Sequence, residues 1–309
     1  MLISFVIPTY NEEESLAELY RQIAANVAST GHDYEIIFID DGSTDGSFAV
    51  MEELHAKDDR VRVIQFRRNY GKAAALEVGF DDVKGEVVFT LDADLQDDPM
   101  EIPRFLEKLD EGYDMVIGWK YPRLDPITKT APSKLFNATL RASTGLNIHE
   151  NNSGYKAMRR IVAEEMTLYG EMHRFIPAIA HWRGFKVTEI KVKHHPRKFG
   201  KTKYGLARMW RGFFDFTTIY FLNQFTRRPL HFFGSVGLVT FGIGFLIDFI
   251  LTVQWALGLT VLHTRPLLWL GFLMIIVGIQ FLIFGLLAEM ITYGRITKQA
   301  DYSIRQTLD

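Results

Sequence analysis

The chain has 309 residues, no cysteine and a formal net charge of −2. Its length and apolar content suffice for one large domain or two modest ones, and the lack of cysteine excludes disulfides, thiolate metal sites and a cysteine nucleophile. The near-neutral total hides an asymmetry, because the stretch from Arg183 to Arg211 holds ten Lys or Arg residues and a single acid, Glu189. This basic stretch precedes the most apolar part of the chain, which indicates a partner that is both anionic and lipidic.

Short β-rich runs alternate with helical patterns over residues 3–119. The runs are ISFVIP, YEIIFID, VRVIQF, EVVFTLD and DMVIGW. Near-continuous apolar strands joined through amphipathic helices predict an α/β domain whose mostly parallel sheet is covered on both faces. The N-terminus has no basic leader and enters the first strand at once, so we expect this domain to stay in the cytoplasm.

Polar residues follow the carboxyl ends of these runs, where ligands of such sheets bind. The first run leads into PTYNE, the second into DDGS, the fourth into DADLQDDP and the fifth into GWK. We therefore expect one edge of the sheet to collect the chemistry of the domain. Ser15 and the stretch from Asn11 to Glu14 also resemble a helix start, so we expect Glu13 and Glu14 to be helix residues rather than ligands.

The acidic run after the fourth strand predicts a metal site. Asp92 and Asp94 would repel each other at a strand end unless a cation joins them, and oxygen ligands beside phosphate suit Mg²⁺ or Mn²⁺. Gln96 is the third expected ligand. Asp97 and Asp98 precede a proline and a helical pattern, so we interpret them as a helix start.

The DDGS segment after the second strand allows two interpretations. Its carboxylates can accept from N–H and O–H groups of a nucleobase or ribose, yet Asp-Gly-Ser is also common turn chemistry. The neighbouring segment IPTYNEEES favours the binding role, because both segments end adjacent strands.

The C-terminal third predicts attachment to a membrane. Residues 205–228 mix aromatics with Arg at helical spacing, as in interfacial helices. Two apolar segments, 229–257 and 267–288, each exceed the roughly 20 residues that span a bilayer and form a hairpin. Basic residues flank its outer ends, so we expect both termini in the cytoplasm. Asp248 lies within the first segment, either as an intramembrane polar site or near the far interface in contact with water or a neighbouring helix, and receives no chemical role.

These segments divide the chain into four expected parts. They are a cytoplasmic α/β domain over 1–204, juxtamembrane amphipathic helices over 205–228, a transmembrane hairpin over 229–292 with helices at about 230–257 and 267–290, and a cytoplasmic tail over 293–309. The inner membrane of a cell is the expected location.

Five motifs together resemble glycosyltransferase family 2, which has the GT-A fold and nucleotide-sugar donors. They are IPTYNEEES, IDDGSTDGS, RNYGKAAAL, LDADLQDDP and GWKYPR, in the family's order and spacing. With the membrane hairpin, the chain resembles the polyprenyl-phosphate glycosyltransferases within that family. The resemblance covers essentially the whole chain.

The resemblance implies roles for individual residues. The nucleotide-sugar site would be lined by Pro8, Tyr10, Glu12, Asp41, Lys72, Asp92 and Lys120. The metal on the diphosphate would be held by Asp92, Asp94 and Gln96, with Asp94 counted among the catalytic residues. Glu150 occupies the acceptor-facing position of an Asp-x-x-Ser-Gly-x-Lys motif, where relatives carry Asp.

The segment HHPRKFGKTKYG supplies positive charge just before the membrane part. Arg197, Lys201 and Lys203 can bind a lipid phosphate from a glycine-containing loop, and the family pattern adds Arg197 and Lys203 to the catalytic set. A polybasic segment that merely attracts anionic lipid is the alternative. His194 and His195 could suggest a metal site, but adjacent strand residues point to opposite faces.

The resemblance implies transfer of a hexose to a polyprenyl phosphate such as undecaprenyl phosphate, and charge considerations favour a direct displacement with inversion. A lipid monophosphate is largely a dianion at neutral pH, since its second pKa is about 6, so no strong general base is required. The expected donor is UDP-glucose, with GDP-mannose as the alternative donor. The alternative kinds of protein are a processive polysaccharide synthase and a non-catalytic membrane scaffold. No nucleic-acid partner is expected, and a second copy of the chain is left open as a partner.

Overall fold

The computed structural model describes residues 1–121, 141, 144–168, 170–193, 195, 218, 221, 229–259, 261 and 265–296. The chain divides into two compact units, Met1–Asp215 and Phe216–Asp309. The first unit contains, in chain order, β1 (Leu2–Thr9), α1 (Leu16–Ala28), β2 (Asp33–Asp40), α2 (Ser47–Lys57), β3 (Val61–Gln65), α3 (Lys72–Asp81), β4 (Val87–Thr90), η1 (Pro99–Glu101), α4 (Ile102–Asp110), β5 (Met115–Lys120), β6 (Lys156–Arg159), α6 (Arg160–Glu164), η2 (Met172–Phe175), α7 (Ile176–Trp182) and β7 (Val187–Val192).

One seven-stranded sheet forms the centre of this unit, in the order β3-β2-β1-β4-β6-β5-β7. All neighbouring pairs are parallel except those of β6, which runs antiparallel to both β4 and β5. The predicted mostly parallel α/β sheet is therefore confirmed. The sequence did not predict β6 and β7, which come after the run of βα units.

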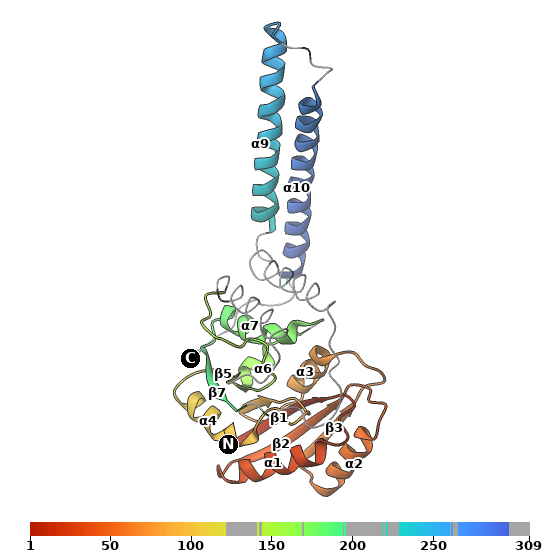
Figure 1. Ribbon diagram of the computed structural model, residues 1–309, viewed down its shortest axis with the longest axis vertical. Coiled ribbons are helices and arrows are strands. Elements are labelled where there is room, and N and C mark those ends of the chain that lie inside the picture. The colour runs from red at the N-terminus through yellow and green to blue at the C-terminus, as the bar shows by residue number, and fades with distance from the viewer. Residues whose placement is uncertain are drawn as a thin grey trace. The chain divides into compact units, whose positions relative to one another are not determined.

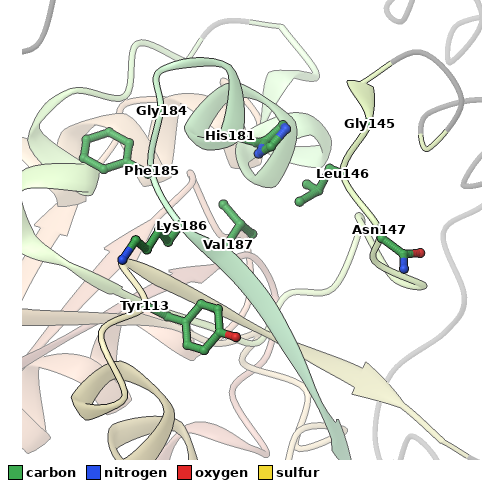
Figure 2. Close-up of a pocket in the computed structure, with 9 residues that line it drawn as sticks. All are labelled: Tyr113, Gly145, Leu146, Asn147, His181, Gly184, Phe185, Lys186 and Val187. Carbon is green, nitrogen blue, oxygen red and sulfur yellow. The ribbon is translucent and has the colours of Figure 1, made fainter.

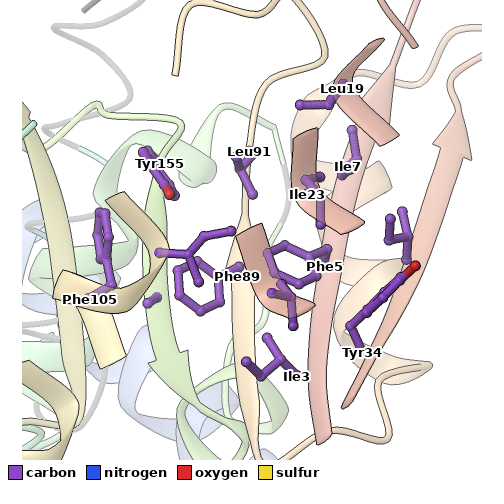
Figure 3. Close-up of a cluster of buried hydrophobic side chains, with 14 of the residues drawn as sticks. Ile3, Phe5, Ile7, Leu19, Ile23, Tyr34, Phe89, Leu91, Phe105 and Tyr155 are labelled. Atoms are coloured by element: carbon purple, nitrogen blue, oxygen red, sulfur yellow. The ribbon is translucent and has the colours of Figure 1, made fainter. Parts of the chain in front are cut away.

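Helices cover the sheet (Figure 1), and a cluster of buried apolar side chains lies on each of its two faces. Alternate residues of the central strands point to opposite faces. On one face, Phe5 of β1 stacks on Phe89 of β4 with ring centroids 5.2 Å apart, and Phe89 meets Phe105 of α4 at 5.7 Å. Figure 3 shows this layer, which α1, α2 and α4 complete. Helices α3, α6 and α7 contribute the buried side chains of the other face.

The second unit contains two long antiparallel helices, α9 (Pro229–Ala256) and α10 (Pro266–Ile296). Glycines bring them close together: a Cβ added to Gly237 would lie 2.7 Å from the Gly278 carbonyl oxygen, and one added to Gly244 would lie 2.7 Å from that of Gly271. Small residues at such contacts let helix backbones pack in a membrane. The predicted helical hairpin is confirmed.

Asp248 of α9 packs against Gly271 of α10, where an added Cβ would lie 2.5 Å from the Asp248 Cγ atom. Both carboxylate oxygens are buried and lack a hydrogen-bond partner among the described residues. The expected contact of Asp248 with a neighbouring helix is observed.

Candidate active site

The carboxyl ends of β1, β2, β4 and β5 lie at one edge of the sheet. They end at Thr9, Asp40, Thr90 and Lys120, and β4 and β5 share a direction because both are antiparallel to β6. Since β6 runs the other way, its first residue, Lys156, arrives at that same edge. The sheet therefore brings the residues before and within β6 to the predicted site.

The acidic turn begins directly after β4. Leu95 has a φ of 57°, which turns the chain back sharply and is unusual for a residue other than glycine. The backbone N–H of Gln96 donates to Asp94 Oδ1 at 3.2 Å, and Asp94 is buried. This turn gives each acid a different direction and a different partner.

Asp92 forms an ion pair with Lys72 at the start of α3. Gly154 lies against its carboxylate, since a Cβ there would be 2.6 Å from the Asp92 Cγ atom. Burial would raise the pKa of Asp92, but Lys72, Lys120 and Lys156 together hold it below its ordinary value. The structure thus brings three predicted residues, Asp92, Lys72 and Lys120, into one electrostatic cluster.

Lys120 and Asp97 form a second ion pair at this edge, with Nζ and Oδ1 3.0 Å apart. Burial lowers the pKa of Lys120, but Asp97, Asp92 and Asp94 outweigh it and raise the value. The interpretation of Asp97 as a helix start is therefore wrong, because its buried carboxylate faces Lys120. It is correct for Asp98, whose side chain caps η1 by accepting from the Met100 N–H at 3.0 Å.

The predicted nucleoside residues lie in two interlocked loops after β1 and β2. The buried carboxylate of Asp41 accepts from the backbone N–H of Tyr70 at 2.6 Å and of Gly71 at 3.0 Å. Burial raises the pKa of Asp41, and these two bonds partly offset the increase. Because Gly71 precedes Lys72, Asp41 also fixes the start of α3.

The loop after β1 is held by residues of the next turn. The N–H of Glu12 donates to Ser47 Oγ at 2.9 Å, and the carboxylate of Glu13 accepts from the Gly46 N–H at 2.6 Å. Helix α1 begins at Leu16, so the prediction of Glu13 and Glu14 as helix residues is wrong. Pro8 and Tyr10 are half-buried at the same edge.

Gln96 connects the acidic turn to the chain after β7. Its side-chain amide donates to the His195 carbonyl at 3.4 Å, and the His195 N–H donates to the Gln96 carbonyl at 3.0 Å. The His195 ring nitrogen Nε2 lies 3.1 Å from Asp98 Oδ2. His194, Arg197, Lys201 and Lys203 lie outside the described residues.

Glu150 and Lys156 form the part of the site that precedes and opens β6. The Glu150 side chain is buried, with 3% of the residue exposed. Lys156 is also buried, and its Nζ donates to the Ser153 carbonyl. Burial and nearby Lys72 lower the pKa of Lys156 to about 7, against the opposing effect of Asp92, Asp97 and Glu150.

Sequence reasoning missed three members of this cluster: Asp97, Lys156 and His173. His173 lies in η2, and its buried Nδ1 has no hydrogen-bond partner among the described residues. Burial, then Lys72, lowers the pKa of His173. The sequence could have indicated Lys156, because it is the lysine of the Ser-Gly-x-Lys motif. No sequence pattern indicated His173, since the approach of η2 to the site depends on how the chain returns after β6.

The donor set suits a divalent cation shared with phosphate. No three His, Asp or Glu side chains within the described ranges converge into a metal-binding group, so the protein would supply Asp92 and Asp94. Mg²⁺ and ions like it are commonly held by one or two carboxylates, with phosphate oxygens and water completing the shell. Lys72 and Lys120 beside these acids could contact the same phosphates.

A pocket of about 460 Å³ lies elsewhere, at the amino end of β7 (Figure 2). It is lined by Tyr113, Gly145, Leu146, Asn147, His181, Gly184, Phe185, Lys186 and Val187. Because β5 and β7 are parallel, this pocket and the carboxyl end of β5 lie at different ends of the strands. The pocket is therefore separate from the electrostatic cluster of Asp92, Lys72 and Lys120.

Comparison with known proteins identifies the family of the chain. Residues 4–167 match the family model described as Glycosyl transferase family 2. The dodecaprenyl-phosphate galacturonate synthase of Rhizobium johnstonii is 35% identical, with 99% of this chain and 93% of that relative aligned. The undecaprenyl-phosphate 4-deoxy-4-formamido-L-arabinose transferase of Klebsiella pneumoniae is 37% identical, over 95% of this chain and 88% of the relative.

Solved structures share the fold. Glucosyl-3-phosphoglycerate synthase from Mycobacterium tuberculosis, crystallised with Mn²⁺, uridine diphosphate and phosphoglyceric acid, superposes with a TM-score of 0.56 at 19% identity. The alignment covers 72% of this chain and 78% of that one. The fold is thus of the GT-A type that the motifs predicted, and the chain is an enzyme that belongs to glycosyl transferase family 2.

Proposed function

We propose that the chain transfers a sugar from a nucleotide sugar to a polyprenyl phosphate in the membrane. The observation that carries the proposal is the edge cluster of Asp92, Asp94, Lys72 and Lys120 in a chain that also has two helices long and apolar enough to cross a bilayer. Relatives whose names specify dodecaprenyl or undecaprenyl phosphate align over nearly the whole chain. We place the enzyme in the inner membrane, with the α/β domain and both termini cytoplasmic.

Asp92, Asp94 and Gln96 would hold Mg²⁺ or Mn²⁺ at the donor diphosphate. The cation would supply Lewis-acid stabilisation of the leaving diphosphate. Lys72 and Lys120 would contact diphosphate oxygens, exchanging part of their pairing with Asp92 and Asp97 for charge-assisted bonds to the substrate. Pro8, Tyr10, Glu12 and Asp41 would line the nucleoside.

Glu150, Arg197, Lys201 and Lys203 would form the acceptor side. At an effective dielectric of about 20, two unit charges about 5 Å apart repel by roughly 3 kcal/mol, so the attacking phosphate needs countercharge. Arg197 and Lys203 would supply it. A phosphate oxygen would then displace the nucleoside diphosphate at the anomeric carbon in one step, with inversion, while Glu150 orients the acceptor.

Glucose from UDP-glucose is the proposed donor. The relatives' names specify galacturonate and 4-deoxy-4-formamido-L-arabinose, so the transferred sugar differs within this group. GDP-mannose is the alternative donor.

One panel tests the proposal. Purified full-length protein receives undecaprenyl phosphate, Mg²⁺ or Mn²⁺, and UDP- and GDP-sugars assayed in parallel for lipid-linked product. Asp94→Asn should reduce turnover by about 10³-fold or more, because it removes a negatively charged ligand of the cation at the donor diphosphate. Glu53→Gln, an exposed change in α2, is the matched control and should keep full activity. Absence of lipid product with every donor, or a product that retains the anomeric configuration of the donor, would contradict the proposal.

A further inference from the structure

Glu189 of β7 binds two successive residues, His149 and Glu150, the second of which belongs to the proposed acceptor side. Its Oε2 accepts from the backbone N–H of His149 at 2.6 Å and of Glu150 at 3.4 Å. Its Oε1 contacts the ring Nδ1 of His149. One carboxylate therefore fixes both the backbone that carries Glu150 and the side chain that precedes it.

The His149 ring is held from a second side by Trp119 of β5. The two rings stack with centroids 4.1 Å apart and planes 6° apart, and Lys191 of β7 lies 5.2 Å from the Trp119 ring. Gly145, Leu146 and Asn147, which come just before this turn, line the pocket at the start of β7 (Figure 2). The His149–Glu150 turn is thus anchored to β5 and β7.

Three polar contacts on one carboxylate argue against a role in packing alone. The Glu189 side chain is only 13% exposed, and Glu150, whose backbone N–H donates to it, is buried as well. An apolar residue could fill the same space, but it could not accept from the two backbone N–H groups.

We propose that Glu189 is a positioning residue, which fixes the His149–Glu150 backbone and thereby sets where the Glu150 carboxylate stands toward the acceptor phosphate. The inference rests on the proposed function, in which Glu150 lies on the acceptor side. Glu189 itself touches no substrate in this scheme, because its oxygens are occupied by His149 and Glu150.

A double-mutant cycle in the full-length protein tests the inference. Transfer to undecaprenyl phosphate is measured for Glu189→Ala, Glu150→Gln and their combination, with the donor that is most active for the wild type. Glu189→Ala should lower kcat by about 10- to 100-fold, as expected when a reacting group is misplaced by about 1 Å, and leave the donor KM and Mn²⁺–UDP affinity within about twofold. The double variant should be no slower than Glu150→Gln, since both changes act through one group.

Two further variants separate positioning from general stability. Glu189→Gln should recover most of the activity, because its amide can accept from the His149 N–H and donate to Nδ1. Glu53→Gln is the matched exposed control. Should Glu189→Ala not fold, Glu189→Asp takes its place in the cycle, since the shorter side chain cannot reach both residues.

Additive losses in the cycle, or a loss of Mn²⁺–UDP affinity equal to the loss of activity, would overturn the inference. If the wild type transfers sugar and Glu150→Gln is equally fast, the inference fails while the proposed function stands. If the wild type makes no lipid-linked product, the proposed function itself has failed.

Discussion

Carboxylates and ammonium groups alternate at the edge of the sheet, where Asp92 meets Lys72 and Asp97 meets Lys120. A buried charge without a partner is costly, so each acid requires a cation close by. Lys156 is buried nearby, and its burial together with Lys72 lowers its pKa to about 7. We infer that these ion pairs can be replaced in part by contacts with a diphosphate, and that the cluster does not serve stability alone.

Gly154 provides a test of this cluster at single-residue scale. A methyl group there would press on the Asp92 carboxylate, and overpacking of this kind costs about 1–3 kcal/mol. Gly154→Ala should therefore weaken Mn²⁺–UDP binding by roughly 5- to 150-fold, measured by titration calorimetry. Gly242→Ala, which has open space around it, is the control; equal affinities for both variants would contradict the assigned contact.

The sequence predicted some of these residues and not others for a physical reason. Asp92 and Asp94 directly follow a strongly apolar strand, so local pattern was sufficient. Asp97 shares the same acidic run, but its pairing with Lys120 depends on two strands separated by β6 in the sheet. Local patterns cannot report such a pairing, and helix-start chemistry described Asp98 alone.

At the scale of elements, the antiparallel strand β6 determines the shape of the site. Its insertion between β4 and β5 carries the preceding motif to the carboxyl edge. The sequence did not predict this strand because KAMR has only two apolar residues, which lie between a lysine and an arginine, so it lacks the apolar or alternating run that indicates a strand. The βα units before it were predicted because each combines an apolar run with an amphipathic helix.

Asp58 joins α1, β2 and the turn before β3. It accepts from Tyr20 of α1 at 2.8 Å and Tyr34 of β2 at 3.1 Å, and pairs with Arg60 before β3. The hydrogen bonds from Arg60, opposed by burial and aided by the tyrosines, hold the pKa of Asp58 well below its usual range. The ionised carboxylate therefore stabilises the fold.

This network predicts an acid-sensitive contribution to stability. A carboxyl whose pKa is depressed in the fold contributes fully above its unfolded value of about 3.9 and loses that contribution as pH falls toward its folded value. The wild type should lose about 1–2 kcal/mol more than Asp58→Asn below about pH 5, with water screening of the half-exposed Arg60 limiting the effect. Thermal unfolding between pH 3 and 7 measures this, with the exposed neighbour change Asp59→Asn as control. Parallel curves for the wild type and Asp58→Asn would count against it.

At the scale of the whole molecule, the apolar surface of α9 and α10 dominates. The 28 residues of α9 span about 42 Å, more than the roughly 30 Å hydrocarbon core of a bilayer. Most of their apolar side chains are exposed, among them Leu238, Trp269 and Met290. An apolar surface of this extent is stable in lipid rather than water, which agrees with an enzyme whose acceptor is a lipid.

The absence of cysteine makes the orientation of this hairpin directly measurable. Single cysteines are introduced at Leu259, exposed in the turn after α9, and at Glu53, exposed in α2. Basic residues favour the cytoplasmic side; Arg227, Arg228, Arg295 and Lys298 flank the outer ends of the pair, against Arg265 alone in the connection. In intact cells, a membrane-impermeant maleimide should label Leu259→Cys, and should label Glu53→Cys only after permeabilisation. The wild type provides a blank without thiols. Labelling of Glu53→Cys but not of Leu259→Cys in intact cells would reverse the assigned topology, because it would separate the α/β domain from cytoplasmic nucleotide sugars.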